Sequence, residues 1–202
     1  MPYSPEEFYA RCLAHADAEH RLPMPDQSMW EIFPFENEGL RAKPLEPPVL
    51  PEPPRRGEDG DDCGFCADPM RDAIWHDERW VLTAWREPLG LPMGVTFLPK
   101  AHLDLGDLDD THAADLGRLV VHTERAIRGL GDIGRVHLYK WGDGGAHLHV
   151  MLLARPAGLL QLRGSNLPLW EEMLPRVDKE VWDADARAVA RALAESYGGE
   201  AR

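Results

Sequence analysis

The chain of 202 residues is long enough to form one domain with a sizeable hydrophobic core and an additional extension. Its hydrophobic share of 44% is ordinary for a globular protein, and its formal net charge is −13. Because it has no run of lysines or arginines, it lacks the basic surface that nucleic-acid binding requires. It also has no apolar run near the roughly 20 residues that span a bilayer. We therefore expect neither nucleic acid nor membrane as a partner, although local cations and backbone N–H groups can still hold a small anion.

The N-terminal segment and the cysteines indicate the compartment. The segment carries early acidic residues and no apolar stretch of the kind that secretory signals contain. The three cysteines are Cys12, Cys63 and Cys66. An odd count that includes a Cys-x-x-Cys pair argues against a disulfide framework. We therefore expect a cytoplasmic protein.

Residues 1–62 form an N-terminal extension of two parts. Ser4, Pro5 and Glu7 make a capping box with proline at the first helical position, which predicts a helix over residues 5–19. Six prolines between Pro44 and Pro54 exclude helix and central strand, so this segment is expected to be an extended strap. Its apolar residues suggest that part of it lies on a surface: Leu45, Val49 and Leu50.

The compact domain is expected to cover residues 63–202. Residues 79–86 and 92–99 are rich in β-branched and aromatic residues and predict two strands. A helix follows, capped by Asp110 or Thr111 and ended by Gly131 and Gly134. Its apolar side is predicted by residues spaced three and four apart: Leu116, Leu119, Val120, Thr123, Ile127 and Leu130.

The second half of the domain predicts a β-hairpin and then helices. Residues 135–141 and 146–154 are expected to be strands joined by the turn Gly-Asp-Gly-Gly. A C-terminal helix has an apolar side closed by Gly198 and Gly199, and that side consists of Trp182, Ala186, Val189, Leu193 and Tyr197. Strands, a helix, strands and further helices in this order favour an α+β fold, with helices packed on an antiparallel sheet.

His147, His149 and Met151 share one face of the predicted strand, because side chains alternate along a strand. Two hydrogen-bonded core histidines are the ordinary explanation of such a pattern. The preceding glycines also allow a ligand to approach the backbone and expose N–H groups to an anion, although a hairpin turn explains them equally well.

The pair in Cys63-Gly64-Phe65-Cys66 has the spacing of a zinc knuckle, which usually needs two further Cys or His ligands. The sequence has no second pair of this kind, so histidines would complete the site, with His76, His102 and His147 as candidates. A redox pair and two unligated thiols are the alternatives. Lys100 and His102, after the second strand, are either loop residues or part of the same crevice.

These motifs together resemble the histidine-triad superfamily. The resemblance covers residues 63–156 and rests on Cys-Gly-Phe-Cys, WHDERWVLTAW, PKAH, the long helix and GDGGAHLH, in that order. The proline-rich approach to the cysteine pair is more similar to the galactose-1-phosphate uridylyltransferase branch than to the small hydrolases. The resemblance implies a structural zinc held by four residues, Cys63, Cys66, His102 and His147. It also implies that His149 is the nucleophile that forms a nucleotidyl-histidine.

The sequence departs from the family at the phosphate-binding positions. Met151 stands where the family has a histidine or glutamine that donates to phosphate, and Gly144 stands where it has serine or threonine. Asp143 adds an acidic group, where the family often has glutamine. The substrate is expected to contact Gly142, Asp143, Gly144, Gly145, Lys140, Met151 and Arg155, with Lys100, Lys140, Arg155 and Arg163 as candidate replacement charges.

Two functions follow from this pattern. In one, the protein is a zinc-containing hydrolase or transferase that acts on a nucleoside phosphate ester through a His149 intermediate. In the other, it is a catalytically degenerate nucleotide-binding or scaffold protein with a structural zinc. A pocket for a less charged substrate is a third hypothesis. By analogy with the family, the protein forms a homodimer.

Overall fold

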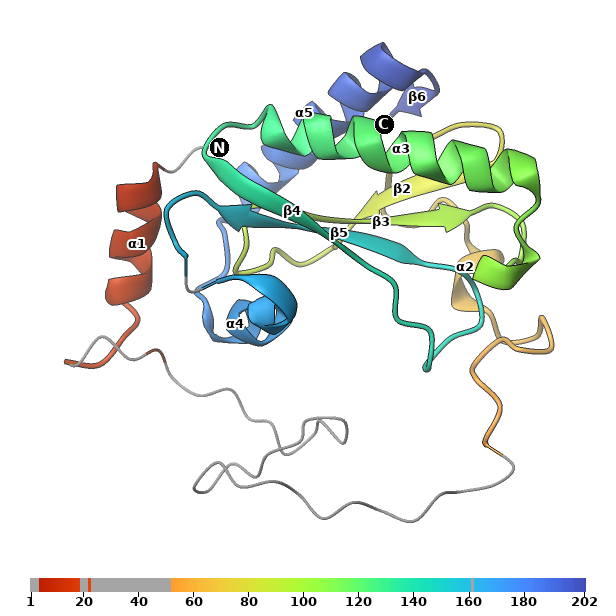
Figure 1. Ribbon diagram of the computed structural model, residues 1–202, viewed down its shortest axis with the longest axis horizontal. Coiled ribbons are helices and arrows are strands. Elements are labelled where there is room, and N and C mark those ends of the chain that lie inside the picture. The colour runs from red at the N-terminus through yellow and green to blue at the C-terminus, as the bar shows by residue number, and fades with distance from the viewer. Residues whose placement is uncertain (1–3, 19–21, 23–51, 161) are drawn as a thin grey trace.

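The computed structural model describes residues 4–18, 22, 52–160 and 162–202 (Figure 1). Its centre is one six-stranded sheet with the order β4-β5-β3-β2-β1-β6, in which every neighbouring pair is antiparallel. The strands are β1 Ala73–His76, β2 Trp80–Ala84, β3 Gly94–Pro99, β4 Ile133–Tyr139, β5 Val150–Pro156 and β6 Glu200–Ala201. An antiparallel sheet with packed helices confirms the predicted α+β fold.

Two long helices cover one face of the sheet. Helices α3 (Asp110–Arg128) and α5 (Lys179–Tyr197) lie on the same side and pack against each other (Figure 1). The predicted apolar sides face the core, because the following residues are buried: Leu119, Thr123 and Ile127 of α3, and Trp182, Ala186, Val189 and Leu193 of α5. Gly198 ends α5 with a φ of 109°, a conformation that glycine adopts without strain.

The opposite face is covered at one end only. Helix α4 (Leu167–Met173) lies on that side, and α1 (Pro5–Leu13) lies near it (Figure 1). Phe8 and Cys12 of α1 are buried in the same hydrophobic cluster as Leu167. The short helix α2 (Gly64–Ala67) lies toward the other end of the sheet (Figure 1). Among the described residues, no helix covers the face between α4 and α2 (Figure 1).

Several predicted boundaries need correction. Helix α1 has the predicted capping box of Ser4 and Glu7 but ends at Leu13, and residue 19 lies outside the described residues. Asp109, not Asp110 or Thr111, caps α3, because its side chain accepts from the His112 N–H. Helix α3 ends at Arg128 with Gly129 as its C-cap, earlier than the predicted glycines. Strands β1 and β6 are short and were not predicted from the sequence.

The predicted hairpin is wrong in its second strand. Strand β5 begins at Val150, so His147 and His149 lie in the connection from β4 rather than in the strand. Their neighbours bond to other segments, since Ala146 N donates to Arg56 O at 3.1 Å and Leu148 N donates to Leu103 O at 2.7 Å. These contacts satisfy the backbone where a ladder to β4 was expected.

The extension is only partly described. The apolar strap residues of the sequence prediction lie outside the described residues, and the division at residues 62 and 63 stays a prediction. In the described part of the chain, no helix is both long and apolar enough to cross a membrane.

Candidate metal centre and adjoining cleft

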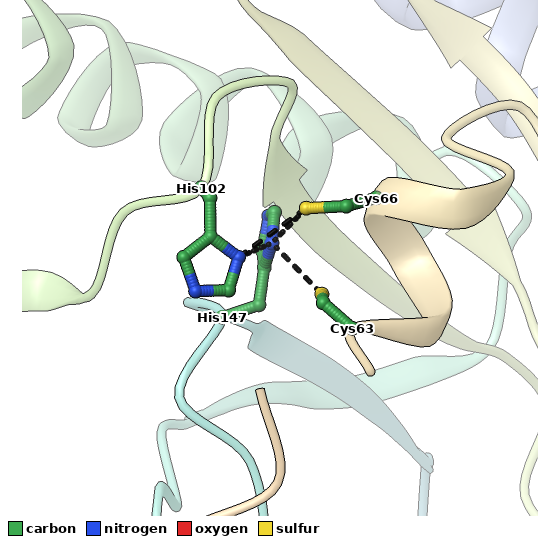
Figure 2. A group of neighbouring side chains, drawn as sticks. All are labelled: Cys63, Cys66, His102 and His147. Atoms are coloured by element: carbon green, nitrogen blue, oxygen red, sulfur yellow. Dashed lines mark hydrogen bonds between the residues drawn. The ribbon is translucent and has the colours of Figure 1, made fainter. Parts of the chain in front are cut away.

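Four side chains from three segments converge beside α2 (Figure 2). Cys63 precedes α2 and Cys66 lies within it, His102 follows β3, and His147 precedes β5. The ligand atoms of all four lie within 4.8 Å of one another. The Cys66 Sγ and His102 Nδ1 atoms are 3.2 Å apart, and the two histidine Nδ1 atoms are also 3.2 Å apart.

The separations suit a tetrahedral zinc ion. Zn–S bonds of about 2.3 Å and Zn–N bonds of about 2.0 Å place the ligand atoms of a tetrahedron about 3.3–3.8 Å apart. The measured contacts from the two cysteines to His147 Nδ1 are 3.5 and 3.4 Å. Four protein ligands also leave no open position, which is typical of structural zinc rather than catalytic zinc. The cluster is therefore a structural zinc site.

His147 is prepared for this role by its surroundings. Its Nε2–H donates to the Pro99 carbonyl at 2.8 Å, which leaves Nδ1 unprotonated and directed at the cysteines. Burial lowers the pKa of His147 and so favours the neutral, ligating form. Without metal, burial and the neighbouring Cys63 raise the pKa of the Cys66 thiol to about 11. The third candidate histidine, His76, lies on β1 and contacts Glu200 instead.

His149 lies next to the metal centre but has a different environment. Its Nδ1 is 2.9 Å from the His147 carbonyl oxygen, a contact in which the ring N–H donates. Among the described residues, no hydrogen-bond partner is found for His149 Nε2. His149 lines the same cleft as Thr96 and Leu98 of β3. One ring nitrogen is therefore fixed, and the other has a free lone pair.

A cleft of about 1230 Å³ occupies the open face beside His149. Its floor includes Thr83, Thr96 and Leu98 from the central strands, and aromatic residues, among them Trp85 and Trp141, line it. The Trp85 indole N–H donates to the Thr96 hydroxyl at 3.2 Å. The charged residues along the cleft are Arg56, Arg71, Arg86, Asp62, Asp68, Asp72 and Asp143. This mixture of aromatic and polar groups suits a small molecule.

The structure brings only some of the predicted substrate residues to the cleft. Asp143, Gly144 and Gly145 line it together with His149. Gly142 contributes its carbonyl to Arg55, at 3.1 Å, and Lys140 forms an ion pair with Asp104 at 3.3 Å.

The remaining predicted contacts and charges lie outside the described lining of the cleft. Arg155 is buried and donates to the carbonyls of Pro156 and Leu159. Met151 is buried in β5 opposite Thr96. The Lys100 ammonium donates to the Asp77 carbonyl at 2.5 Å.

Most residues that line the cleft were not predicted from the sequence, among them Arg56, Trp85 and Thr96. Thr83 and Thr96 interrupt two otherwise apolar strands, which is a signal that one face of those strands is not core. Arg56 carries no such signal, because its position depends on how the end of the extension folds back.

No protein-family model and no curated protein matches the chain. Among solved structures, a hypothetical histidine triad nucleotide-binding protein from Sulfolobus tokodaii is 18% identical, with a TM-score of 0.50, over 67% of this chain and 97% of that one. A Hit-like protein involved in cell-cycle regulation from Bartonella henselae is 15% identical, with a TM-score of 0.50, over 66% and 98%. A zinc-bound histidine triad family protein from Mycobacterium smegmatis is 23% identical, with a TM-score of 0.48, over 66% and 94%.

The first two structures show that about two thirds of this chain adopts the fold of histidine-triad proteins. This agrees with the resemblance that the motifs indicate.

Proposed function

We propose that the protein is an enzyme that transfers a nucleotidyl group from a nucleoside phosphate ester to water or a second acceptor through a covalent His149 intermediate. The observation that carries this proposal is the state of the His149 ring. Its Nδ1–H is held by the His147 carbonyl at 2.9 Å, while its Nε2 has no hydrogen-bond partner in the described part of the chain and the residue lines the cleft. A neutral imidazole held in this way is a suitable nucleophile for phosphorus.

The reaction would proceed in two steps. The His149 Nε2 lone pair attacks phosphorus, a P–N bond forms, and the bond from phosphorus to the leaving oxygen breaks. The Nδ1 proton stays on the ring, where the His147 carbonyl stabilises the positive charge of the intermediate. A water molecule or acceptor hydroxyl then attacks phosphorus, the P–N bond breaks, and the acceptor loses its proton. His149 is returned to its neutral form.

The metal would act on this reaction indirectly. Cys63, Cys66, His102 and His147 would hold zinc, which supplies a rigid cross-link between the three segments. His147 is both a ligand and the residue whose carbonyl orients His149. The cross-link therefore fixes the nucleophile without touching the substrate.

The cleft supports a nucleoside-bearing substrate. Its aromatic residues offer flat surfaces for a base, and Gly144 and Gly145 line the same cleft as His149. Backbone N–H groups in that glycine segment would stabilise negative charge on the phosphate oxygens. A cytoplasmic location and a homodimer stay predictions.

The test compares His149→Gln, which keeps the side-chain volume, with His122→Gln as a matched control on α3. His149→Gln is expected to lower turnover of the active substrate by at least about 10³-fold, because the nucleophile is lost. The substrates to assay are nucleotide sugars, dinucleoside polyphosphates and nucleoside phosphoramidates. Both variants should retain one zinc per chain. Equal turnover by the two variants would contradict the proposal.

A second function, nucleotide binding without catalysis, is favoured by a specific observation. Met151 is buried and Gly144 has no side chain, so two donors that would contact phosphate are missing. Losing one such donor can slow a reaction by about 10²–10³. In this case nucleotides would raise the melting temperature of the protein, but no substrate of the panel would turn over.

A further inference from the structure

The end of the N-terminal extension is joined to the glycine segment of the cleft. Arg56 forms a parallel bridge with Gly145, and its carbonyl accepts from Ala146 N at 3.1 Å. Arg55 donates to Asp104 at 2.6 Å and to the Gly142 carbonyl at 3.1 Å. Residues 55 and 56 are therefore held against the segment that leads to His147 and His149.

Gly57 fixes the same stretch against the metal centre. It is buried with a φ of +77°, and a Cβ atom there would lie 3.2 Å from the Cys63 Cβ and 3.6 Å from the His102 ring. Only glycine combines this conformation with such close packing at low cost. Because Arg55 and Gly57 are both fixed, the backbone of Arg56 between them has a defined place at the rim of the cleft.

The Arg56 side chain is the unpaired cation among the described residues of the cleft. Arg71 pairs with Asp68 at 3.6 Å, and Arg86 pairs with Asp72 at 3.2 Å. Arg56 is exposed, lines the cleft with His149, and has no carboxylate partner in the described part of the chain. A free guanidinium can donate two parallel hydrogen bonds to a phosphate group.

The position of Arg56 matches what the cleft lacks. Gly144 contributes no side-chain donor, and buried Met151 cannot donate. The backbone of Arg56 contacts Gly145, the residue next to Gly144. We propose that Arg56, supplied by the extension, binds the substrate phosphate at His149 in place of these missing donors.

The single unpaired cation also limits how many phosphate groups of a substrate the cleft can neutralise. Three arginines and four aspartates line the cleft, so the carboxylates outnumber the guanidinium groups by one. A single phosphate can be matched by Arg56, whereas additional phosphates would meet the carboxylates without further free cations. Resting on the proposed function, the inference therefore assigns the site to substrates that present one phosphate group at His149.

The test measures binding of uridine and adenosine monophosphates and triphosphates by calorimetry, with metal absent from the buffer apart from the bound zinc. Arg56→Ala is expected to weaken monophosphate binding by about 10- to 100-fold, the loss of a charge-assisted contact. Arg56→Lys should retain part of the affinity. The control Arg128→Ala removes the same charge from α3, outside the cleft, and should bind as the wild type does. The wild type should bind monophosphates more tightly than triphosphates.

Three results would overturn the inference. These are unchanged binding in Arg56→Ala, a larger loss in Arg71→Ala or Arg86→Ala, and tighter binding of triphosphates. Zinc content and the melting temperature show whether each variant is folded. The failure of this inference is distinct from the failure of the proposed function. If nucleotide binding depends on Arg56 but no turnover depends on His149, only the enzyme proposal is contradicted. If turnover depends on His149 but Arg56→Ala has no effect on binding, only this inference is contradicted. A wild type that binds no nucleotide would contradict both.

Discussion

The metal centre and the proposed phosphate-binding part of the cleft are neighbours that share one stretch of chain, residues 145–149, but they differ in completeness. The metal centre has all four ligands, and His147 also has a partner for its second ring nitrogen. In the phosphate-binding part, Gly144 and Met151 offer no side-chain donor. A metal site needs a fixed ligand set, whereas a phosphate can be held by a cation from another segment. Replacing a side chain is therefore tolerated more readily in the phosphate-binding part than at the metal centre.

Removing a metal ligand is expected to have the largest effect on zinc content and on the free energy of unfolding. His102→Ala should lose zinc and lower the free energy of unfolding by about 4 kcal/mol, because metal loss is among the few strongly destabilising changes. His76→Ala, the control, should retain one zinc per chain, since His76 lies on β1 away from the cluster. Metal analysis and denaturant unfolding measure both. Zinc retained in His102→Ala would show that the cluster is not the metal site.

A destabilising substitution away from the metal centre distinguishes zinc loss caused by a missing ligand from zinc loss caused by general instability. The Asp115 carboxylate is buried between Arg79, at 2.6 Å, and Arg118. Asp115→Asn should lower the free energy of unfolding by about 2 kcal/mol, because the arginines lose their buried partner but stay partly solvated. The variant should still bind one zinc. Loss of zinc in Asp115→Asn would mean that zinc content reports overall stability rather than the ligand set.

The effect of Asp115→Asn should depend on pH with a definite sign. Burial alone would raise the pKa of Asp115, but hydrogen bonds from Arg118 and Arg79 outweigh it and hold the pKa below the ordinary value of 3.8. A lowered pKa in the folded state stabilises the protein above about pH 4, and this contribution is lost as the pH falls through the folded-state pKa. Unfolding of both proteins between pH 7 and pH 2 should therefore show their difference shrinking below pH 4. A constant difference would contradict this assignment.

The smallest effect is expected from restoring one donor in the phosphate-binding part. A Cβ atom at Gly144 would meet no atom within 4 Å, so a side chain fits there. Gly144→Ser should tighten nucleoside monophosphate binding by roughly 2- to 10-fold, the value of one net hydrogen bond. Gly144→Ala fits equally well but adds no hydroxyl and should leave the dissociation constant unchanged. Calorimetric titration of the two variants compares them, and equal affinities would mean that phosphate does not lie beside Gly144.

The sequence predicts the parts of this molecule that depend on local pattern. The period of α3 and α5 and the β-branched strands β2 and β3 follow from residue type and spacing, and they give the α+β fold. The resemblance to the histidine-triad superfamily also names the four residues that the structure brings together at the metal centre.

The rest depends on contacts between distant segments. His147 and His149 alternate with apolar residues as in a strand, but backbone bonds to Arg56 and Leu103 hold the stretch outside the sheet. The position of Arg56 could not be predicted for the same reason. A residue after a proline-rich segment has no local feature that places it beside Gly145. Lys140, a candidate substrate contact in the sequence, is instead paired with Asp104. The sequence lists the charged residues but does not show which of them are neutralised by ion pairs in the fold.

The central claim is that His149 forms a covalent bond to phosphorus. Its most direct measurement is to mix the protein with a nucleoside phosphate ester that carries radioactive phosphorus next to the nucleoside, quench within a turnover, and map the label by mass spectrometry. We predict one nucleotidyl group per chain, bound to His149 through an acid-labile P–N bond and absent from His149→Gln. A wild-type protein that binds nucleotide but carries no label with any substrate of the panel would contradict it.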